Sequence, residues 1–307
     1  MRSDTLPSRK FAVSIKQYIL PFMLFTQEFV FLAFPKTGSS FVRTIIKSRG
    51  VELRKRHCLL PQFFWPKNVF VEQMVIRKSP AGIHQHGSRS QSEDEMVLKS
   101  SWHSTRINLW KRKNKRQIIS VWRDPVDRFL SVFKFQFYAL WDGEMREEVE
   151  KRYPTFPDWS LSDMYEWKSL EQKRRLKILF PNCEGDDLGI GPGSWQFILF
   201  FASKQLKDRL IEAWPKSESE VLEMFLIDTA EIHFLNQKGL NEQLESMLKG
   251  SAFEKTKSEE DQTARVNVTR QNHLFVSSHD VNEAELNEIR ENEQFLYDYA
   301  EKRNLHC

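Results

Sequence analysis

Cysteine is scarce in this chain of 307 residues. The three cysteines, Cys58, Cys183 and Cys307, are too few and too widely separated to build a disulfide framework or a metal-binding cluster. The sequence therefore excludes a disulfide-stapled scaffold, permits a reducing compartment and predicts no resident metal. Glycine is scarce too, and because four of the 11 glycines fall within residues 182–193, we expect that segment to be a loop that approaches a ligand.

A long uninterrupted apolar run is also missing. The most apolar stretch, residues 18–34, is broken by Pro21, Gln27 and Glu28, and it falls short of the roughly 18 apolar residues that a membrane span needs. No small-residue cleavage site of a signal peptide follows it. We therefore expect no stable membrane insertion, a buried strand at residues 28–34, and a packed extension before that strand.

Acidic residues are absent between Met96 and Arg123, although the net charge of the whole chain is only +4. A basic stripe of this kind attracts polyanions or phosphorylated ligands, or it is simply a solvated face. Its members are Lys99, Arg106, Lys111, Arg112, Lys113, Lys115 and Arg116.

The features that are present predict an α/β protein. Hydrophobic residues make up 40% of the chain, which is the proportion of a folded globule rather than of a disordered chain. The buried run at 28–34 leads through a loop into a helical pattern at 41–46, and residues 117–122 form a second apolar run followed by another helix. Because strand, loop and helix occur twice, we expect a central parallel sheet flanked by helices.

Capping residues indicate where several helices begin and end. Asp124 is expected to cap the helix that starts at Pro125, with Asp127 in the capping-box position. Later helices are predicted at residues 219–227 and at 230–249, the second interrupted at Gly239.

A final helix is predicted at residues 281–303. Asp280 and Glu283 frame its start, and Leu286 and Ile289 mark its inner face.

The loop after the first predicted strand carries phosphate-binding chemistry. Lys36 adds a positive charge, the hydroxyls of Thr37, Ser39 and Ser40 add donors, and Gly38 lets the backbone turn close to a ligand. The order of residues differs from the Walker A pattern, in which the lysine follows the last glycine. Taken alone, the segment is also compatible with an ordinary turn between a strand and a helix.

A second polar segment follows the second predicted strand. Arg123 lies at the carboxyl end of that strand, where open α/β sheets bind ligands, and Ser131 lies two turns into the next helix. An arginine fork and a hydroxyl can together hold a phosphate. A capped helix with an exposed arginine is the alternative.

Together the two segments, Pro35-Lys36-Thr37-Gly38-Ser39-Ser40 and Arg123-Asp124-Pro125-Val126-Asp127-Arg128 through Ser131, resemble those of the P-loop-like sulfotransferases. That family uses 3′-phosphoadenosine 5′-phosphosulfate (PAPS) as donor. The resemblance implies a P-loop NTPase-like fold and a PAPS-binding core. It assigns the 5′-phosphosulfate to Lys36, Thr37, Gly38, Ser39 and Ser40, and the 3′-phosphate to Arg123 and Ser131.

Within this family the chain is most similar to the uronic-acid 2-O-sulfotransferases. The likeness lies in Trp102-His103-Ser104, in the segment from Val121 to Pro125, and in the aromatic-rich helix that follows. It implies transfer to a hydroxyl of a carbohydrate, in particular an anionic glycan.

The chemistry of sulfuryl transfer calls for a base and a cation. Lys36 suits the role of a clamp beside the scissile bond, and a neutral histidine can take the proton of the acceptor hydroxyl. His103 matches the 2-O-sulfotransferase layout, whereas His86 resembles the histidine of other sulfotransferase branches. We favour His103 and keep His86 as the second candidate, and no metal is required.

Two rival functions stay open at this point. A P-loop kinase would need a lysine after the glycine and an acidic magnesium ligand, and a non-catalytic glycan-binding protein would use the basic stripe alone. We expect one domain, a cytoplasmic location with the Golgi lumen or membrane as the alternative, and no nucleic-acid partner. The expected parts of the domain are an N-terminal extension (1–27), the PAPS-binding core (28–140) and a helical acceptor-side and C-terminal part (141–307).

Overall fold

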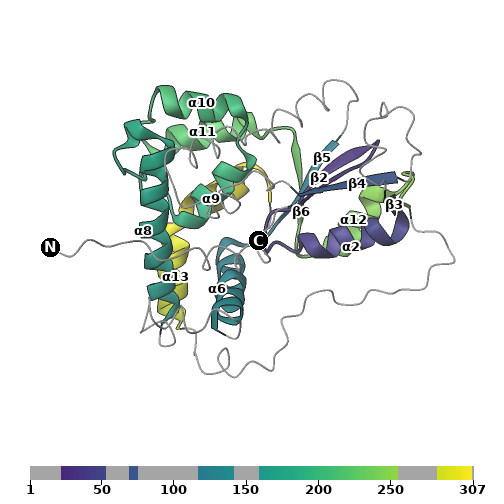
Figure 1. Ribbon diagram of the computed structural model, residues 1–307, viewed down its shortest axis with the longest axis horizontal. Helices are drawn as coiled ribbons and strands as arrows, with labels where there is room; N and C mark the ends of the chain where they lie inside the picture. Colours follow the sequence, from purple (N-terminus) through teal and green to yellow (C-terminus); the bar gives the residue numbers. More distant parts are fainter. Residues whose placement is uncertain (1–21, 53–68, 75–116, 142–158, 255–281, 306–307) are drawn as a thin grey trace, which may run out of the picture.

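The computed structural model describes residues 22–52, 69–74, 117–141, 159–254 and 282–305 (Figure 1). In these ranges a six-stranded sheet is flanked by helices, which confirms the predicted α/β class.

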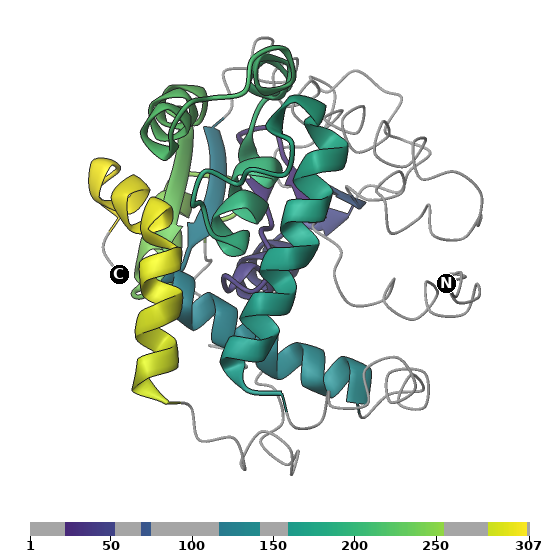
Figure 2. The same ribbon diagram turned by 90° about the vertical axis from the view of Figure 1, so that its left-hand side faces the viewer.

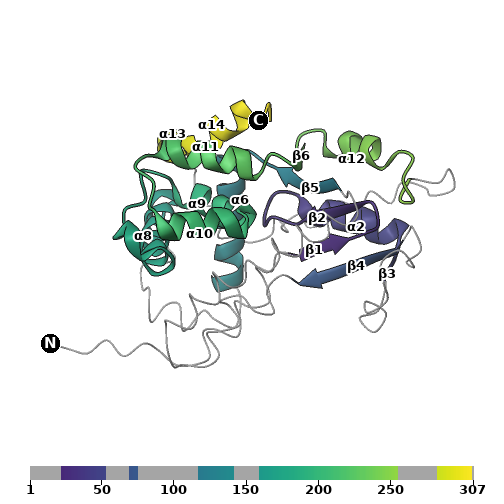
Figure 3. The ribbon, with the colours of Figure 1, turned by 90° about the horizontal axis from the view of Figure 1, so that it is seen from above.

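The sheet has the strand order β3-β4-β1-β2-β5-β6, with β3 and β6 at its two edges (Figure 3). The neighbours β2, β5 and β6 are parallel, and so are β3 and β4, whereas β1 is antiparallel to both of its neighbours. The sheet is therefore mixed but mostly parallel. The strands are β1 (Phe22–Phe25), β2 (Phe29–Leu32), β3 (Val51–Glu52), β4 (Val69–Met74), β5 (Gln117–Trp122) and β6 (Ile232–Asn236).

Strand β1 lies in the segment that the sequence predicted to be an extension before the sheet. A tight turn centred on Thr26 reverses the chain there: the Thr26 hydroxyl donates to the Phe29 carbonyl at 2.9 Å and accepts from the Phe29 N–H at 2.9 Å. So short a connection can join only antiparallel strands, because a parallel pair needs a long crossover. In the described residues the sheet therefore starts with β1, within the packed extension that we expected to precede the first strand.

Helices cover the two faces of the sheet, and β2 contributes to both. Val30 and Leu32 pack with helices α9, α10, α11 and α14, whereas Phe29 and Phe31 pack with α2 and α12. A strand buried on both faces has a continuous apolar sequence, which explains the run at 28–34. The helices of the two faces are α2 (Ser39–Arg49), α9 (Pro192–Phe201), α10 (Lys204–Glu212), α11 (Glu218–Asp228), α12 (Leu240–Leu248) and α14 (Gln294–Lys302).

A third group of helices packs beside the sheet (Figure 2). It consists of α6 (Pro125–Trp141), α8 (Leu161–Leu179) and α13 (Glu283–Asn292), and a short 3-10 turn, η4 (Pro181–Cys183), follows α8. Phe129 and Tyr165 meet edge to face at 5.1 Å in its core, where Ile289 is also buried.

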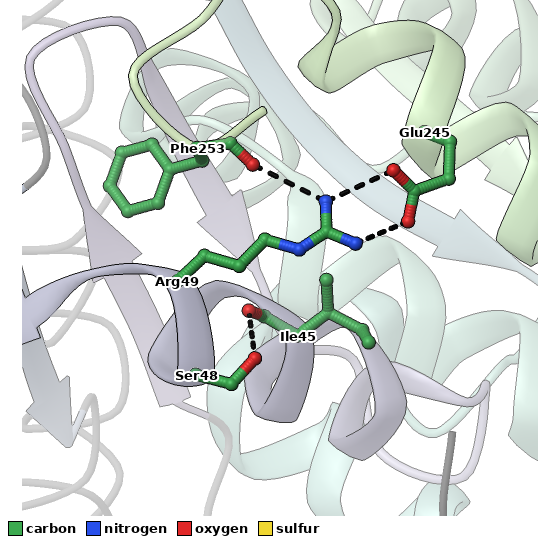
Figure 4. A network of polar contacts seen from close by, with 5 residues as sticks. All are labelled: Ile45, Ser48, Arg49, Glu245 and Phe253. Carbon is green, nitrogen blue, oxygen red and sulfur yellow. Dashed lines mark hydrogen bonds and ion pairs between the residues drawn. The ribbon is translucent and has the colours of Figure 1, made fainter. Parts of the chain in front are cut away.

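Arg49 clamps the carboxyl-terminal end of α2 to α12 (Figure 4). Its guanidinium binds both carboxylate oxygens of Glu245, one of them at 3.0 Å, and also donates to the Phe253 carbonyl at 3.3 Å. Since the Arg49 side chain is only 7% exposed, this pair fixes how the two helices lie against each other.

Two of the predicted helices are wrong in part. In the segment predicted as helical over 230–249, the interruption at Gly239 is confirmed, since α12 starts directly after it. The part before Gly239 is not a helix but strand β6, which pairs in parallel with β5 from Ile232 opposite Ile118 to Asn236 opposite Trp122. Pairing with a distant strand here overrides a local helical pattern.

The helix predicted over 281–303 is likewise broken, at Glu293, into α13 and α14. A capping box of Asn282 and Glu285 forms its start, and Glu283, expected to frame that start, is its first residue, whereas Asp280 lies outside the described residues.

Other local predictions are confirmed. The Asp124 carboxylate accepts from the Asp127 N–H at 2.9 Å and so caps α6, as expected. Helices α2 and α11 also fall where their patterns placed them. In the described ranges no helix combines the length and the apolarity needed to cross a membrane.

Candidate functional site

The carboxyl ends of β2, β5 and β6 bring three loops together. Arg123, directly after β5, donates from Nη1 to the Lys36 carbonyl at 3.1 Å. The Gln237 N–H, directly after β6, donates to the Trp122 carbonyl at 2.8 Å. Gln237 also flanks Gly38, since its Cγ would lie 3.5 Å from a Cβ added there. The two segments singled out in the sequence thus meet at the carboxyl ends of the parallel strands, where α/β proteins bind ligands.

The loop between β2 and α2 is shaped by its own hydroxyl groups. Thr37 and Ser39 both donate to the Phe34 carbonyl at 2.9 Å, and their side chains are buried. These two hydrogen bonds therefore stabilise the turn. Because both hydroxyl protons are engaged, the backbone N–H groups are the main donors that this loop offers to a ligand. Ser40 is half-buried at the first turn of α2.

The start of α2 is open to an anion. Gly38, its N-cap residue, has a left-handed backbone with φ of 91°, and no side chain caps the helix. Lys36 shares this unusual geometry, with φ of 65°, which a residue with a Cβ adopts only when its surroundings enforce it. The unpaired N–H groups and positive dipole of a helix N-terminus favour phosphate or sulfate.

Two positive charges lie close together beside this helix end. Burial, together with the nearby Arg123, lowers the pKa of Lys36 to about 8. Burial also lowers the pKa of Arg123, while Asp127 and Asp124 act in the opposite direction. The Arg123 Nε is buried without a hydrogen-bond partner. A bound anion would stabilise both cations, and the orphaned Nε suits such a ligand.

Arg128 is a site residue that the sequence analysis did not single out. Its side chain is 5% exposed, and its Nε donates to the Pro35 carbonyl at 3.2 Å. Its Nη2 donates to Gln196 on α9, and its guanidinium carbon lies 4.2 Å from the centre of the Phe34 ring. One signal was available, because Arg128 is three positions after buried Pro125 and so shares the inner face of α6.

The remaining predicted site residues are not all brought together. Ser131 is half-buried on α6 and does not hydrogen-bond to Arg123. His86 and His103 lie outside the described residues, as does the basic stripe. Their assignments stay predictions.

The glycine-rich segment 182–193, which we expected to approach a ligand, packs against Glu293, and its contact with a ligand stays a prediction. At the start of α9, the carboxylate of Glu293 accepts from the Gly193 N–H at 2.8 Å and from the Ser194 N–H at 2.7 Å. Tyr165 donates to the same carboxylate at 2.9 Å. A Cβ on Gly191 would lie 2.4 Å from the Asn292 carbonyl oxygen, so the glycines allow close packing. The Glu293 carboxylate therefore binds the N–H groups at the N-terminus of α9.

The described ranges contain no group of three or more histidine, cysteine or acidic side chains placed to hold a metal. Comparison with protein families gives one match, to the family described as sulfotransferase domain, over residues 26–180. The match covers just over half of the 307 residues and includes both the β2–α2 loop and the segment from Arg123 to Ser131. No curated protein and no solved structure matches the chain.

Proposed function

The chain belongs to the sulfotransferase family, and from that premise we propose that it transfers the sulfuryl group of PAPS to a hydroxyl of an anionic carbohydrate. The single observation that carries the donor assignment is the meeting of an uncapped helix N-terminus, Lys36 and Arg123 at one edge of the sheet. These groups fit a ligand with phosphate and sulfate at one end. The donor supplies a sulfuryl group bonded to a phosphate leaving group.

In this proposal the β2–α2 loop binds the 5′ end of the donor. The backbone N–H groups of Gly38, Ser39 and Ser40 bind the anionic oxygens, with Thr37 and Ser39 keeping the loop closed through Phe34. The Lys36 ammonium stabilises the charge that develops on the bridging oxygen as the bond from sulfur breaks. Because burial holds its pKa near 8, Lys36 can also give its proton to that oxygen.

Arg123 and Ser131 bind the 3′-phosphate in this proposal. Arg123 donates from Nη1 to the Lys36 carbonyl, and its Nε has no hydrogen-bond partner, so the guanidinium keeps donor capacity for an anion. One guanidinium thus links the two ends of the donor site, since it touches the 5′ loop and selects the 3′-phosphate.

The proton of the acceptor hydroxyl goes to a histidine. As a bond forms between the acceptor oxygen and sulfur, the bond from sulfur to the phosphate oxygen breaks, and the imidazole takes the hydroxyl proton. We propose His103 for this role, with His86 as the second candidate. The basic stripe from Lys99 to Arg116 supports an anionic glycan as acceptor, because it concentrates polyanions near His103. The family match favours neither the kinase nor the non-catalytic alternative.

Titration calorimetry without added metal tests the donor assignment. Adenosine 3′,5′-bisphosphate, the product of transfer, should bind in the micromolar range and ADP far more weakly. Arg123→Ala should weaken bisphosphate binding by roughly 10- to 100-fold and ADP binding much less, because the 3′-phosphate loses its charged partner, whereas the lost bond from Arg123 to the Lys36 carbonyl affects both ligands. Arg174→Ala, at an exposed position of α8, is the matched control and should change neither. Equal binding of ADP would overturn the proposal.

Transfer itself is then measured with radiolabelled PAPS and a panel of uronic-acid-containing glycans. Lys36→Ala should abolish transfer while the protein stays folded, and His103→Ala should lower turnover far more than donor affinity. If only His86→Ala has that effect, the base is His86.

A further inference from the structure

The three carbonyls that lead into the left-handed turn of the β2–α2 loop are all held by side chains. The first of these carbonyls, that of Phe34, accepts hydrogen bonds from the hydroxyls of Thr37 and Ser39. The next two carbonyls, of Pro35 and Lys36, bind Arg128 and Arg123 respectively. Both arginines come from the segment that follows β5, so that segment holds the main chain of the loop at two consecutive peptides.

The hydrogen bonds of Arg128 go to the protein itself. With 5% exposure and with its donors directed to Pro35 and to Gln196, it presents no surface to a ligand. The cation lies over the Phe34 ring, which further fixes its place. This arrangement differs from that of its neighbour Arg123, which is half-buried and keeps an orphaned Nε.

We propose that Arg128 is a positioning residue for the sulfuryl-transfer step: braced by Gln196, it holds the Pro35 carbonyl and thereby keeps Lys36 in its left-handed conformation. The proposal rests on the proposed function for its catalytic consequence, and it separates Arg128 from the 3′-phosphate site formed by Arg123.

The energetics explain why such a brace is needed. A left-handed backbone at a residue with a Cβ costs about 1–2 kcal/mol, so Lys36 relaxes unless several contacts oppose it. Displacing a reacting group by about 1 Å is enough to slow a reaction roughly 100-fold. A contact that only orients the loop can therefore control turnover without touching the donor.

Arg128 remains a cation in its buried site. Burial lowers its pKa to about 10, the nearby Glu293 carboxylate raises it, and Arg123 lowers it slightly. Glu293 is itself fixed on the first turn of α9, the helix that carries Gln196. Helix α9 thus supplies a hydrogen-bond acceptor, Gln196, and its first turn holds the negative charge of Glu293 near the same guanidinium.

The test compares three variants of the brace with one of the ligand site. Arg128→Met removes the bond to Pro35, and Gln196→Met removes the support of Arg128 without changing any charge. Both should lower kcat, Arg128→Met by roughly 100-fold and Gln196→Met by less, with a small change in KM for PAPS. Gln196→Glu, which keeps the acceptor oxygen, should restore turnover. The preference for adenosine 3′,5′-bisphosphate over ADP should persist in all three, whereas Arg123→Ala should lose it.

A second readout does not depend on transfer. Trace acetylation of Lys36 between pH 7 and pH 10, followed by mass spectrometry, reports its pKa, which is about 8 in the wild-type structure. Relaxation of the loop in Gln196→Met should raise that pKa toward the ordinary value of 10.5. Gln196→Met decides the question if Arg128→Met fails to fold.

Three results would overturn the proposal. One is a loss of the 3′-phosphate preference in Arg128→Met, which would place Arg128 in the ligand site. The others are unchanged turnover and an unchanged acetylation profile in Gln196→Met. If the wild-type protein neither binds the bisphosphate nor transfers sulfate, the proposed function fails, and the acetylation profile still decides whether Arg128 and Gln196 position Lys36.

Discussion

Raising the pH should weaken donor binding through Lys36. In the unliganded protein its pKa is about 8, because the ammonium is partly buried and lies near Arg123. About nine-tenths of Lys36 is then protonated at pH 7 and about one-tenth at pH 9. An anion binds the ammonium form and raises the pKa of Lys36 again, so binding takes up a proton above pH 8. Affinity must therefore fall as the pH rises.

The size of the effect follows from the same pKa. If the anion restores the ordinary value of 10.5, the dissociation constant for adenosine 3′,5′-bisphosphate should be roughly tenfold larger at pH 9 than at pH 7. A lysine that already had its ordinary pKa would produce almost no change over this range. Lys36→Arg, which stays charged throughout, is the matched control and should give a flat profile.

Calorimetry in two buffers of different ionisation enthalpy measures both the affinity and the number of protons taken up. The wild-type protein should take up close to one proton at pH 9 and little at pH 7. A flat affinity profile, or binding at pH 9 without proton uptake, would refute the assigned pKa and the placing of Lys36 against the donor.

Three further predictions concern stability, measured by urea unfolding. Gly191→Ala places a Cβ 2.4 Å from the Asn292 carbonyl oxygen and should lower the free energy of unfolding by roughly 2–3 kcal/mol. Gly189→Ala, at a residue with a positive φ but open space around it, should lower it by about 1 kcal/mol. Equal losses of stability would contradict the packing argument. Glu293→Ala leaves the donors at the start of α9 unpaired and should cost more than about 3 kcal/mol, and a loss below about 1 kcal/mol would show that water replaces the carboxylate. A double-mutant cycle on Arg49 and Glu245 should give a coupling of about 1 kcal/mol, and zero coupling would mean that the clamp contributes nothing.

Local signals predicted the parts of the fold that local chemistry decides. The buried run of β2, the Asp124 cap of α6 and the meeting of Lys36 with Arg123 all follow from short stretches of sequence combined with the rule for parallel sheets. The motif of each loop is contiguous, so its residue types reveal its chemistry before the fold is known.

The remaining features depend on partners far away in the sequence. Strand β6 resembles a helix start until it is paired with β5. Glu293 looks like one more acidic residue on a surface helix, yet it is buried because α9, about 100 residues earlier, begins against it. The brace of Arg128 likewise needs Gln196, which no local pattern connects to the β2–α2 loop. Periodicity and capping describe neighbours along the chain and carry no information on such contacts.

The position of Glu293 so late in the chain bears on how the protein is made. During synthesis the site motifs emerge first, but β5 remains an unpaired edge strand until β6 has been added, and the first turn of α9 lacks its carboxylate until α14 begins. Until those residues have been made, a growing chain carries an exposed strand edge and an unsatisfied helix end, a state prone to aggregation.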